Sequence, residues 1–257
     1  MDLTAEFKIL AVINGSVQGR ISAAIIPTMS RRGKFITFEG LDGTGKSTQM
    51  RKLAAKLRGA GHKVVETREP GGTATGEKIR RVLLDSATQG LSPMAEMALM
   101  FASRAQHIAE VIQPALEHGH IVLCDRFTDS TEAYQGSGRK LGSEAVLELH
   151  RVVCGDLQPD LTILLNSDPA KSVGRARKRN QGVADRAGKK GSKHNDENRF
   201  EQETRAFFAR VHEGYRVIAA REPRRVTAVD ARGTPAETHG RIMELLGRKL
   251  NLGVRKE

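Results

Sequence analysis

An eight-residue segment that begins at Gly40 constrains this 257-residue chain more than any other feature. Gly40–Ser47 has the sequence GLDGTGKS and matches the pattern G-x-x-x-x-G-K-S/T, with a β-rich run (Lys34–Glu39) before it and a helical pattern after it. Glycines let successive backbone N–H groups converge on phosphate, and the start of a helix adds positive potential. Lys46 can reach the β- and γ-phosphates, and Ser47 can bind Mg²⁺. The segment therefore predicts a nucleoside triphosphate site between a buried strand and a helix.

Short apolar runs alternate with helical patterns along the rest of the chain. This alternation is typical of a parallel sheet with helices on both faces, in which ligands bind at the carboxyl ends of the strands. We therefore predict an α/β fold. The predicted strands are residues 34–39, 63–67, 120–124, 160–165 and 225–229, and the predicted helices are residues 46–59, 77–84, 92–117, 143–153, 168–180, 199–221 and 235–250.

Composition and charge exclude several classes of protein. No run approaches about 18 apolar residues, so no membrane-spanning helix is expected. The two cysteines, Cys124 and Cys154, fit a reducing cytosol better than a disulfide scaffold, and the absence of Trp argues against binding of single strands by stacking. The net charge of +12 is concentrated, since residues 171–199 hold ten basic and three acidic residues. This distribution indicates a local anion site, so we expect no nucleic-acid partner and no membrane partner.

The first stretch of the chain, residues 1–32, differs in character from the rest of the sequence. It lacks the sustained apolar core of a secretory signal, and Asp2 and Glu6 are unusual in an organellar presequence. We interpret it as a disordered extension or as an upstream start that is not used, with the functional chain beginning near Met29. One domain is then expected over residues 33–250, with a tail at residues 251–257.

Charged side chains come directly after two other predicted strands. Asp125 and Arg126 lie at the end of the third strand, where a carboxylate can hold Mg²⁺ and an arginine can neutralise a phosphate. Arg68 comes after the second strand in the segment REPGGT and indicates a second phosphate site. On the long helix, Phe101 and Arg104 lie on one face, and an arginine inside an apolar stripe needs a buried partner.

Together these motifs resemble those of the thymidylate kinase family. The segments AYQGSGR (133–139), PDLT (159–162) and NRFEQE (198–203) add to the resemblance, which runs from about Gly33 to the C-terminus. It implies the P-loop nucleoside monophosphate kinase fold, a five-stranded parallel sheet flanked by helices with a mobile lid at about residues 175–199. It also implies a cytoplasmic homodimer that phosphorylates dTMP to dTDP with ATP and Mg²⁺.

The resemblance assigns a dTMP site to particular residues. It implies that Asp42 contacts the 3′-hydroxyl group and that Arg104 bonds to the thymine edge. Two arginines, Arg68 and Arg126, would hold the phosphate of dTMP. The further substrate-binding residues would be Phe101, Tyr134 and Gln135.

The resemblance also assigns the ATP site and the metal site. Ser47 and Asp125 would bind Mg²⁺. Lys46, Arg126 and Arg175 would be the catalytic residues. The residues that bind ATP would be Gly40, Leu41, Asp42, Gly43, Thr44, Gly45, Lys46, Ser47 and Thr48.

Two departures from the family pattern leave alternatives open. The aromatic residue that covers the base in the family corresponds here to Met100, so either Met100 or the next residue, Phe101, covers it, and we favour Phe101. The P-loop carries Gly43 and Thr44 in place of an arginine, which indicates that a lid arginine serves ATP. Arg175 is our first choice among the candidates Arg175, Arg179, Arg186 and Arg199.

Other functions fit parts of the pattern. A related P-loop kinase of another nucleotide or of a deoxynucleoside would share the Asp125-Arg126 pair, although the segments AYQGSGR and REPGG argue against it. A P-loop regulatory or DNA-handling ATPase would need no dTMP site and would retain DNA at physiological salt. The intact Lys46 and Ser47 argue against an inactive binding module. Tolerance for dUMP does not follow from the sequence.

Overall fold

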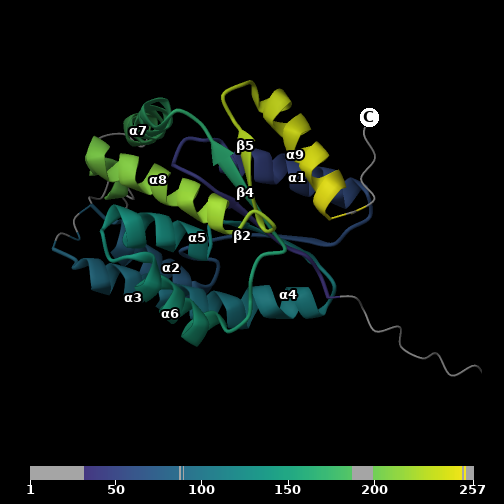
Figure 1. The fold of residues 1–257 in the computed structure, drawn as a ribbon, viewed down its shortest axis with the longest axis horizontal. Coiled ribbons are helices and arrows are strands. Elements are labelled where there is room, and N and C mark those ends of the chain that lie inside the picture. Colours follow the sequence, from purple (N-terminus) through teal and green to yellow (C-terminus); the bar gives the residue numbers. More distant parts are fainter. Residues whose placement is uncertain (1–31, 87, 89, 187–198, 251, 253–257) are drawn as a thin grey trace, which may run out of the picture.

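The computed structural model describes residues 32–86, 88, 90–186, 199–250 and 252. Its centre is a sheet of five parallel strands in the order β2-β3-β1-β4-β5 (Figure 1). The predicted five-stranded parallel sheet is therefore confirmed. The strands are β1 (Phe35–Glu39), β2 (Val64–Arg68), β3 (Ile121–Asp125), β4 (Leu161–Asn166) and β5 (Val226–Asp230).

The strand register brings the charged strand ends together. Phe38 of β1 pairs with Asp125 of β3, which pairs on its other side with Arg68 of β2. Because all strands run in the same direction, the segments after β1, β2 and β3 leave the sheet at one edge. This is the edge where ligands bind in open α/β sheets.

Alternate residues of the central strand β1 face two separate cores. Ile36 and Phe38 pack with α1 (Lys46–Gly59) and α9 (Pro235–Lys249) on one side of the sheet. Phe35 faces the other side and packs with residues of α3 and α6. Figure 1 shows the same division, with α1 and α9 together on one side and α3, α6 and α8 on the other.

The remaining helical elements surround this sheet. They are α2 (Ala74–Leu84), α3 (Pro93–His107), the π-helical segment η1 (Ile108–Ile112), α4 (Gln113–Glu117), α5 (Thr128–Thr131), the π-helical segment η2 (Glu132–Gly138), α6 (Ser143–Cys154), α7 (Pro169–Arg186), the 3-10 turn η3 (Phe200–Gln202) and α8 (Arg205–Arg221).

The helices differ from the sequence prediction in a few places. Of the predicted helix 92–117, residues 93–117 are helical and Ser92 is the N-cap, and η1 interrupts the α-helical hydrogen bonding. The helix predicted at residues 77–84 begins earlier, because the Thr73 side chain accepts the N–H of Gly76 and caps the first turn. Residues 128–138, for which no element was predicted, are helical.

Three of the predicted segments lie wholly or partly outside the described residues. Of the predicted extension 1–32, the structure describes Arg32, which pairs with Asp160 at 3.2 Å. Of the predicted tail, it describes Leu252. The first part of the predicted lid belongs to α7, and residues 187–198 lie outside the described part. Among the described helices, none has the length and apolar character needed to cross a membrane.

Candidate active site

The loop between β1 and α1 has the backbone of a phosphate cradle. Residues 40–48 form this loop and the first turn of α1. Gly43 and Gly45 have φ angles of 78° and 98°, which glycine adopts readily. A Cβ atom at Gly43 would come within 2.1 Å of the carbonyl oxygen of Ser172, so the first turn of α7 packs directly against the loop. The N–H groups at the start of α1 therefore face the carboxyl edge of the sheet with a helix dipole behind them.

Lys46 is a buried cation held over this loop. Its side chain is 5% exposed, and Nζ donates to the carbonyl oxygens of Gly40 (3.0 Å) and Leu41 (3.1 Å). Burial, and then the charge of Arg126, lower the pKa of Lys46. The carboxylates of Asp125, Asp42 and Glu39 oppose this shift, with Oδ1 of Asp42 3.9 Å from Nζ, and an anionic phosphate beside Nζ would stabilise the ammonium further.

Ser47 and Asp125 together present oxygen atoms suited to a hard cation. The Ser47 hydroxyl donates to Oδ2 of Asp125 at 2.9 Å, and Oδ1 of Asp125 is buried without a hydrogen-bond partner in the described part of the chain. Mg²⁺ prefers such oxygen ligands and keeps water and phosphate oxygens around it. The described residues contain no group of three or more His, Cys, Asp or Glu side chains that could hold a metal. The oxygen atoms of Ser47 and Asp125 fit a Mg²⁺ ion that takes its other ligands from a nucleotide and water.

Arg126 lies at the centre of a polar cluster beside the P-loop. Its Nη2 donates to Oδ1 of Asp42 (2.8 Å) and to the Tyr134 hydroxyl (3.3 Å). Its Nη1 donates to Ser130 (2.9 Å) and to the Tyr215 hydroxyl (3.2 Å). Burial opposes the charge, but Asp42 and the neighbouring hydroxyl groups hold the pKa of Arg126 well above its ordinary value. A permanent, oriented guanidinium at this point can bind a phosphate.

Arg104 is 2% exposed. As expected for an arginine in an apolar stripe, it has a buried partner, Glu69. Its Nε donates to Glu69 at 2.7 Å, and its Nη2 donates to Thr131 at 2.9 Å. The guanidinium carbon lies 4.7 Å from the ring centre of Phe101 and 5.0 Å from that of Phe127. Nη1 is buried and has no hydrogen-bond partner among the described residues. Arg104 therefore keeps one donor that a bound base could use.

Arg68 and Gln135, also predicted to contact the substrate, are engaged by carboxylates. Arg68 is half-exposed and pairs with Glu77 at 3.1 Å. Gln135 is buried and donates to Glu96 at 2.7 Å. The structure therefore brings Asp42, Arg126 and Tyr134 into direct contact, whereas Arg68 and Gln135 contact Glu77 and Glu96.

Comparison with known proteins decides the family. The family described as Thymidylate kinase matches residues 38–242. The chain belongs to the thymidylate kinase family. It is 47% identical over 220 residues to the thymidylate kinase of Trichlorobacter lovleyi, a match that covers 86% of this chain and 100% of that protein. The thymidylate kinase of Solidesulfovibrio magneticus is 45% identical over 218 residues, with 84% and 100% covered.

A solved structure shows the same fold. The crystal structure of thymidylate kinase from Ehrlichia chaffeensis matches this chain with a TM-score of 0.63 and 32% identity, over 84% of this chain and 99% of that one. The resemblance to the thymidylate kinase family and the predicted P-loop nucleoside monophosphate kinase fold are thus confirmed.

The structure describes the side chains of two of the four arginines predicted as candidates for the ATP site. Arg175 in α7 donates through Nε to the carbonyl oxygen of Gly43 at 2.8 Å, so it lies against the P-loop. Arg199 pairs instead with the fully buried Glu96 at 2.8 Å. This contrast supports Arg175 over Arg199, and its contact with ATP stays a prediction. The side chains of the other candidates, Arg179 and Arg186, lie outside the described residues.

The two candidates for covering the base lie in different surroundings. Phe101 is 2% exposed and belongs to the core that includes Phe35 and Phe127. Met100 is partly exposed and packs against the cluster that contains Tyr134. Which of the two residues covers the base stays a prediction.

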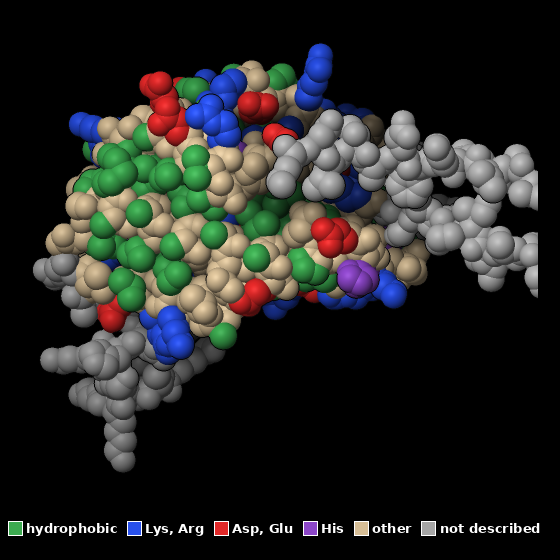
Figure 2. All heavy atoms as spheres, turned by 90° about the horizontal axis from the view of Figure 1, so that it is seen from below, with side chains coloured by type: hydrophobic (Ala, Val, Ile, Leu, Met, Phe, Trp, Pro, Cys, Tyr) green, Lys and Arg blue, Asp and Glu red, His purple; other side chains and the backbone are tan. Residues whose placement is uncertain are grey.

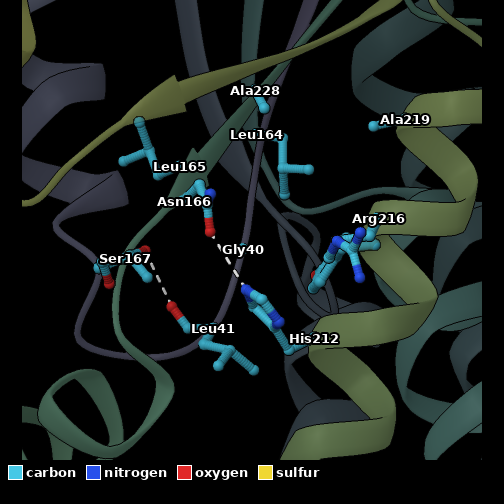
Figure 3. Close-up of a pocket in the computed structure, with 12 residues that line it drawn as sticks. Gly40, Leu41, Leu164, Leu165, Asn166, Ser167, His212, Arg216, Ala219 and Ala228 are labelled. Atoms are coloured by element: carbon cyan, nitrogen blue, oxygen red, sulfur yellow. Dashed lines mark hydrogen bonds between the residues drawn. The ribbon is translucent and has the colours of Figure 1, made fainter.

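A cavity of about 220 Å³ opens behind the P-loop, between β4, β5 and α8 (Figure 3). Leu41 and Leu164 contribute to its apolar wall. At its polar end Nε2 of His212 lies 3.1 Å from Oδ1 of Asn166. Gly40, Leu41 and Thr44 of the P-loop line one side of it, so the cavity adjoins the predicted ATP site, whereas Lys46, Ser47, Asp125 and Arg126 are not among its lining residues.

Sequence reasoning missed three buried carboxylates that organise the site. Glu69 holds Arg104, Glu96 holds Gln135, and Glu39 holds the segment after Arg126. Glu39 carried a usable signal, because it is a charged residue at the end of a buried strand, the same criterion that found Asp125 and Arg126.

Proposed function

We propose that this chain transfers the γ-phosphoryl group of ATP to dTMP and releases dTDP and ADP. The observation that carries the proposal is the position of Arg126, which contacts Asp42 of the P-loop and Tyr134 at the edge of the sheet that also holds Lys46. A triphosphate cradle beside a second phosphate-binding arginine fits an enzyme that transfers a phosphoryl group from one nucleotide to another. The relatives named above are thymidylate kinases.

The proposed reaction depends mainly on positioning the two substrates and on stabilising the charge of the transferred phosphoryl group. Lys46 and the P-loop N–H groups hold the phosphates of ATP, while Arg126 and Arg68 hold the phosphate of dTMP. An oxygen of dTMP attacks the γ-phosphorus in line. Its bond to phosphorus forms as the bond to the β–γ bridging oxygen breaks, and ADP leaves with that electron pair. No general base is required, because a phosphate monoester has its second pKa at about 6 and the oxygen is already ionised.

The proposed cofactor is Mg²⁺ bound together with ATP. Ser47 and the unpaired Oδ1 of Asp125 would face it. When bound, the ion neutralises charge on the β- and γ-phosphates. Lys46 and Arg175 of this chain would compensate the charge that remains during transfer.

The nucleoside part of dTMP would extend from Arg126 toward α3. We propose that Asp42 contacts the 3′-hydroxyl group, that the free Nη1 donor of Arg104 bonds to thymine, and that Tyr134 and Gln135 lie against the nucleotide. Met100 would cover the base, because Phe101 already packs beneath the guanidinium of Arg104.

The test of the function is an ADP-release assay with ATP and Mg²⁺, run in parallel against dTMP, dUMP, dCMP, dGMP, AMP and thymidine. We expect a strong preference for dTMP. Activity with another acceptor would keep the phosphate sites and discard the base contacts. ATP-dependent retention of DNA at physiological salt, with no phosphorylated product, would favour the DNA-handling ATPase instead.

Replacing Arg104 with lysine is expected to raise KM for dTMP about tenfold, because an ammonium cannot pair with Glu69 and also present a second donor to the base. The charge opposite Glu69 stays in place, so the variant should fold. The assay above, with each substrate varied in turn, measures both Michaelis constants. An equal rise in KM for ATP would show that Arg104 is structural.

We propose that the enzyme is a homodimer. Figure 2 shows hydrophobic side chains gathered on the face that Figure 1 places below the sheet, where α2, α3 and α6 lie. Such a patch on a protein surface marks an interface, and two-fold pairing is the commonest way to cover it. The large exposed hydrophobic residues on these helices are Val82, Met94, Leu147 and Val152.

A double variant tests this interface. Met94→Glu with Val152→Glu adds charge to two of its most exposed positions, 53% and 79%, and should give a monomer by light scattering. Val217→Glu on α8 is the control, because Val217 is also 50% exposed but lies on another helix, and it should leave the dimer intact. A monomeric wild-type chain would contradict the proposal.

We propose a cytoplasmic location. Both cysteines, Cys124 and Cys154, are buried and unpaired, which fits a reducing compartment.

A further inference from the structure

Glu39, the last residue of β1, is a buried carboxylate that the proposed reaction does not use. Its exposure is 0%. Oε1 accepts the backbone N–H of Phe127 at 2.7 Å, and Oε2 accepts the hydroxyl groups of Ser130 and, at 3.1 Å, Tyr215. One carboxylate thus joins the start of α5 to α8, the two elements that surround Arg126.

The backbone at Arg126 needs support of this kind. Its φ of 76° lies in the left-handed region, which is unfavourable for a residue with a Cβ atom. The Arg126 N–H donates to the carbonyl oxygen of Phe38, and its own carbonyl oxygen accepts the thiol of Cys124, both at 3.0 Å. The next N–H, that of Phe127, donates to Glu39. Such a turn persists where its surroundings fix it, and Glu39 supplies one of these three bonds.

Glu39 also acts on the guanidinium through two hydroxyl groups. Ser130 and Tyr215 both donate to Glu39, and both accept hydrogen bonds from Nη1 of Arg126. A hydroxyl that donates to a carboxylate keeps its lone pairs for a cation on its other side. Nη1 is therefore held in place, and Nη2 remains directed at Asp42.

We propose that Glu39 is a positioning residue of the dTMP site, which fixes the backbone turn at Arg126 and the orientation of its guanidinium through Phe127, Ser130 and Tyr215. The inference rests on the proposed function, in which Arg126 binds the phosphate of dTMP. Glu39 itself touches neither substrate.

The charge of Glu39 is costly to the folded chain. Burial and the neighbouring Asp129 raise the pKa of Glu39 from 4.5 to about 7, against the opposing effects of the Ser130 bond and Arg126. The folded chain therefore favours the protonated side chain. The resulting stabilisation of the fold is complete below pH 4.5 and is lost as the pH rises through about 7. A neutral glutamine at position 39 carries no such cost at pH 8. The ionisable groups that face Glu39 are Lys46, Cys124, Arg126, Asp129, Tyr215 and Arg225.

The Glu39→Gln variant tests the inference. Its amide oxygen can still accept from Phe127, but its NH₂ group cannot accept from Ser130 and Tyr215, so both hydroxyl groups lose the acceptor that directs their lone pairs toward Arg126. At pH 8 we expect KM for dTMP to rise about tenfold and KM for ATP to change less than about twofold. Tm at pH 8 should not fall, so weaker dTMP binding would be separated from lost stability.

Two further variants complete the test. Glu132→Gln alters another buried carboxylate, which pairs with Arg221 at 2.6 Å, and should lower Tm while KM for dTMP stays within about twofold of wild type. Tyr215→Phe removes one of the two bridging hydroxyl groups and should raise KM for dTMP by a smaller factor than Glu39→Gln.

The outcomes distinguish a failure of the proposed role of Glu39 from a failure of the proposed function. If the wild-type chain makes dTDP and Glu39→Gln has an unchanged KM for dTMP, the proposed role of Glu39 is overturned. The proposed function is then unaffected. If Glu39→Gln does not fold, an unchanged KM for dTMP in Tyr215→Phe would overturn the proposed role of Glu39. A wild-type chain that makes no dTDP would remove the proposed function, and the inference would go with it.

Discussion

Replacing Lys46 with alanine is expected to lower kcat on the order of 10³-fold, the loss seen when one preorganised donor to developing charge is removed. Lys46 is the cation of the P-loop, and its Nζ contacts the backbone oxygens of Gly40 and Leu41. Because burial lowers the pKa of Lys46, keeping this ammonium charged destabilises the folded chain, and its removal should not lower Tm. An ADP-release assay at saturating ATP and dTMP, with thermal unfolding monitored by circular dichroism, measures both effects.

Lys52→Ala is the matched control for this prediction. Lys52 lies on the same helix, α1, but is exposed, so its loss should leave kcat near that of wild type. Turnover of Lys46→Ala within about tenfold of wild type would contradict the assignment of the P-loop lysine.

The region from β1 to α1 could be predicted because local sequence decides it. The left-handed Gly45 caps the start of the helix, and the left-handed Gly61 (φ 88°) terminates it just beyond Gly59, so the predicted helix 46–59 has the bounds found in the structure. The five strands could equally be predicted from short apolar runs, with ends that shift by one residue. Parallel strands then fix the edge where Asp125 and Arg126 lie.

The helical segment at residues 128–138 could not be predicted from local pattern. Its sequence, TDSTEAYQGSG, is polar and has no apolar stripe, yet most of it is buried. Its acidic side chains are satisfied by distant arginines, Asp129 by Arg225 and Glu132 by Arg221, both at 2.6 Å. Tertiary partners about 90 residues away along the chain thus stabilise a helix that its own composition does not favour.

The partners within the site were unpredictable for a related reason. Helical spacing correctly placed Phe101 and Arg104 on one face, but it could not show whether that face meets the core or the substrate. The structure buries Phe101 beneath the guanidinium and supplies Glu69 from the loop after β2. Which carboxylate meets which arginine depends on how the helices pack, as the pairing of Arg199 with Glu96 also shows.

Replacing Arg126 with alanine is expected to lower kcat/KM for dTMP by about 10³-fold or more, in the range for an arginine that stabilises a phosphoryl group in transfer. Its guanidinium contacts Asp42, Tyr134 and two further hydroxyl groups, so its orientation is fixed at the edge of the sheet where we place the phosphate of dTMP. Arg126→Lys should recover little, because a single ammonium cannot make a bidentate contact and hold Asp42 as well. The acceptor assay, with dTMP varied, gives kcat/KM for each variant.

Two comparisons separate the side chain of Arg126 from its backbone. Arg126→Gly should be as inactive as Arg126→Ala but have a higher Tm, because glycine adopts a φ of 76° without a steric penalty. Arg221→Ala removes another arginine that pairs with a buried carboxylate and should lower Tm while leaving kcat/KM for dTMP near wild type. A kcat/KM for Arg126→Ala within about tenfold of wild type, or an equal loss in Arg221→Ala, would show that Arg126 contributes to folding and not to the binding of a phosphate. The two losses should differ by orders of magnitude, since of these two arginines it is Arg126 that directly follows β3 at the edge where the strands end.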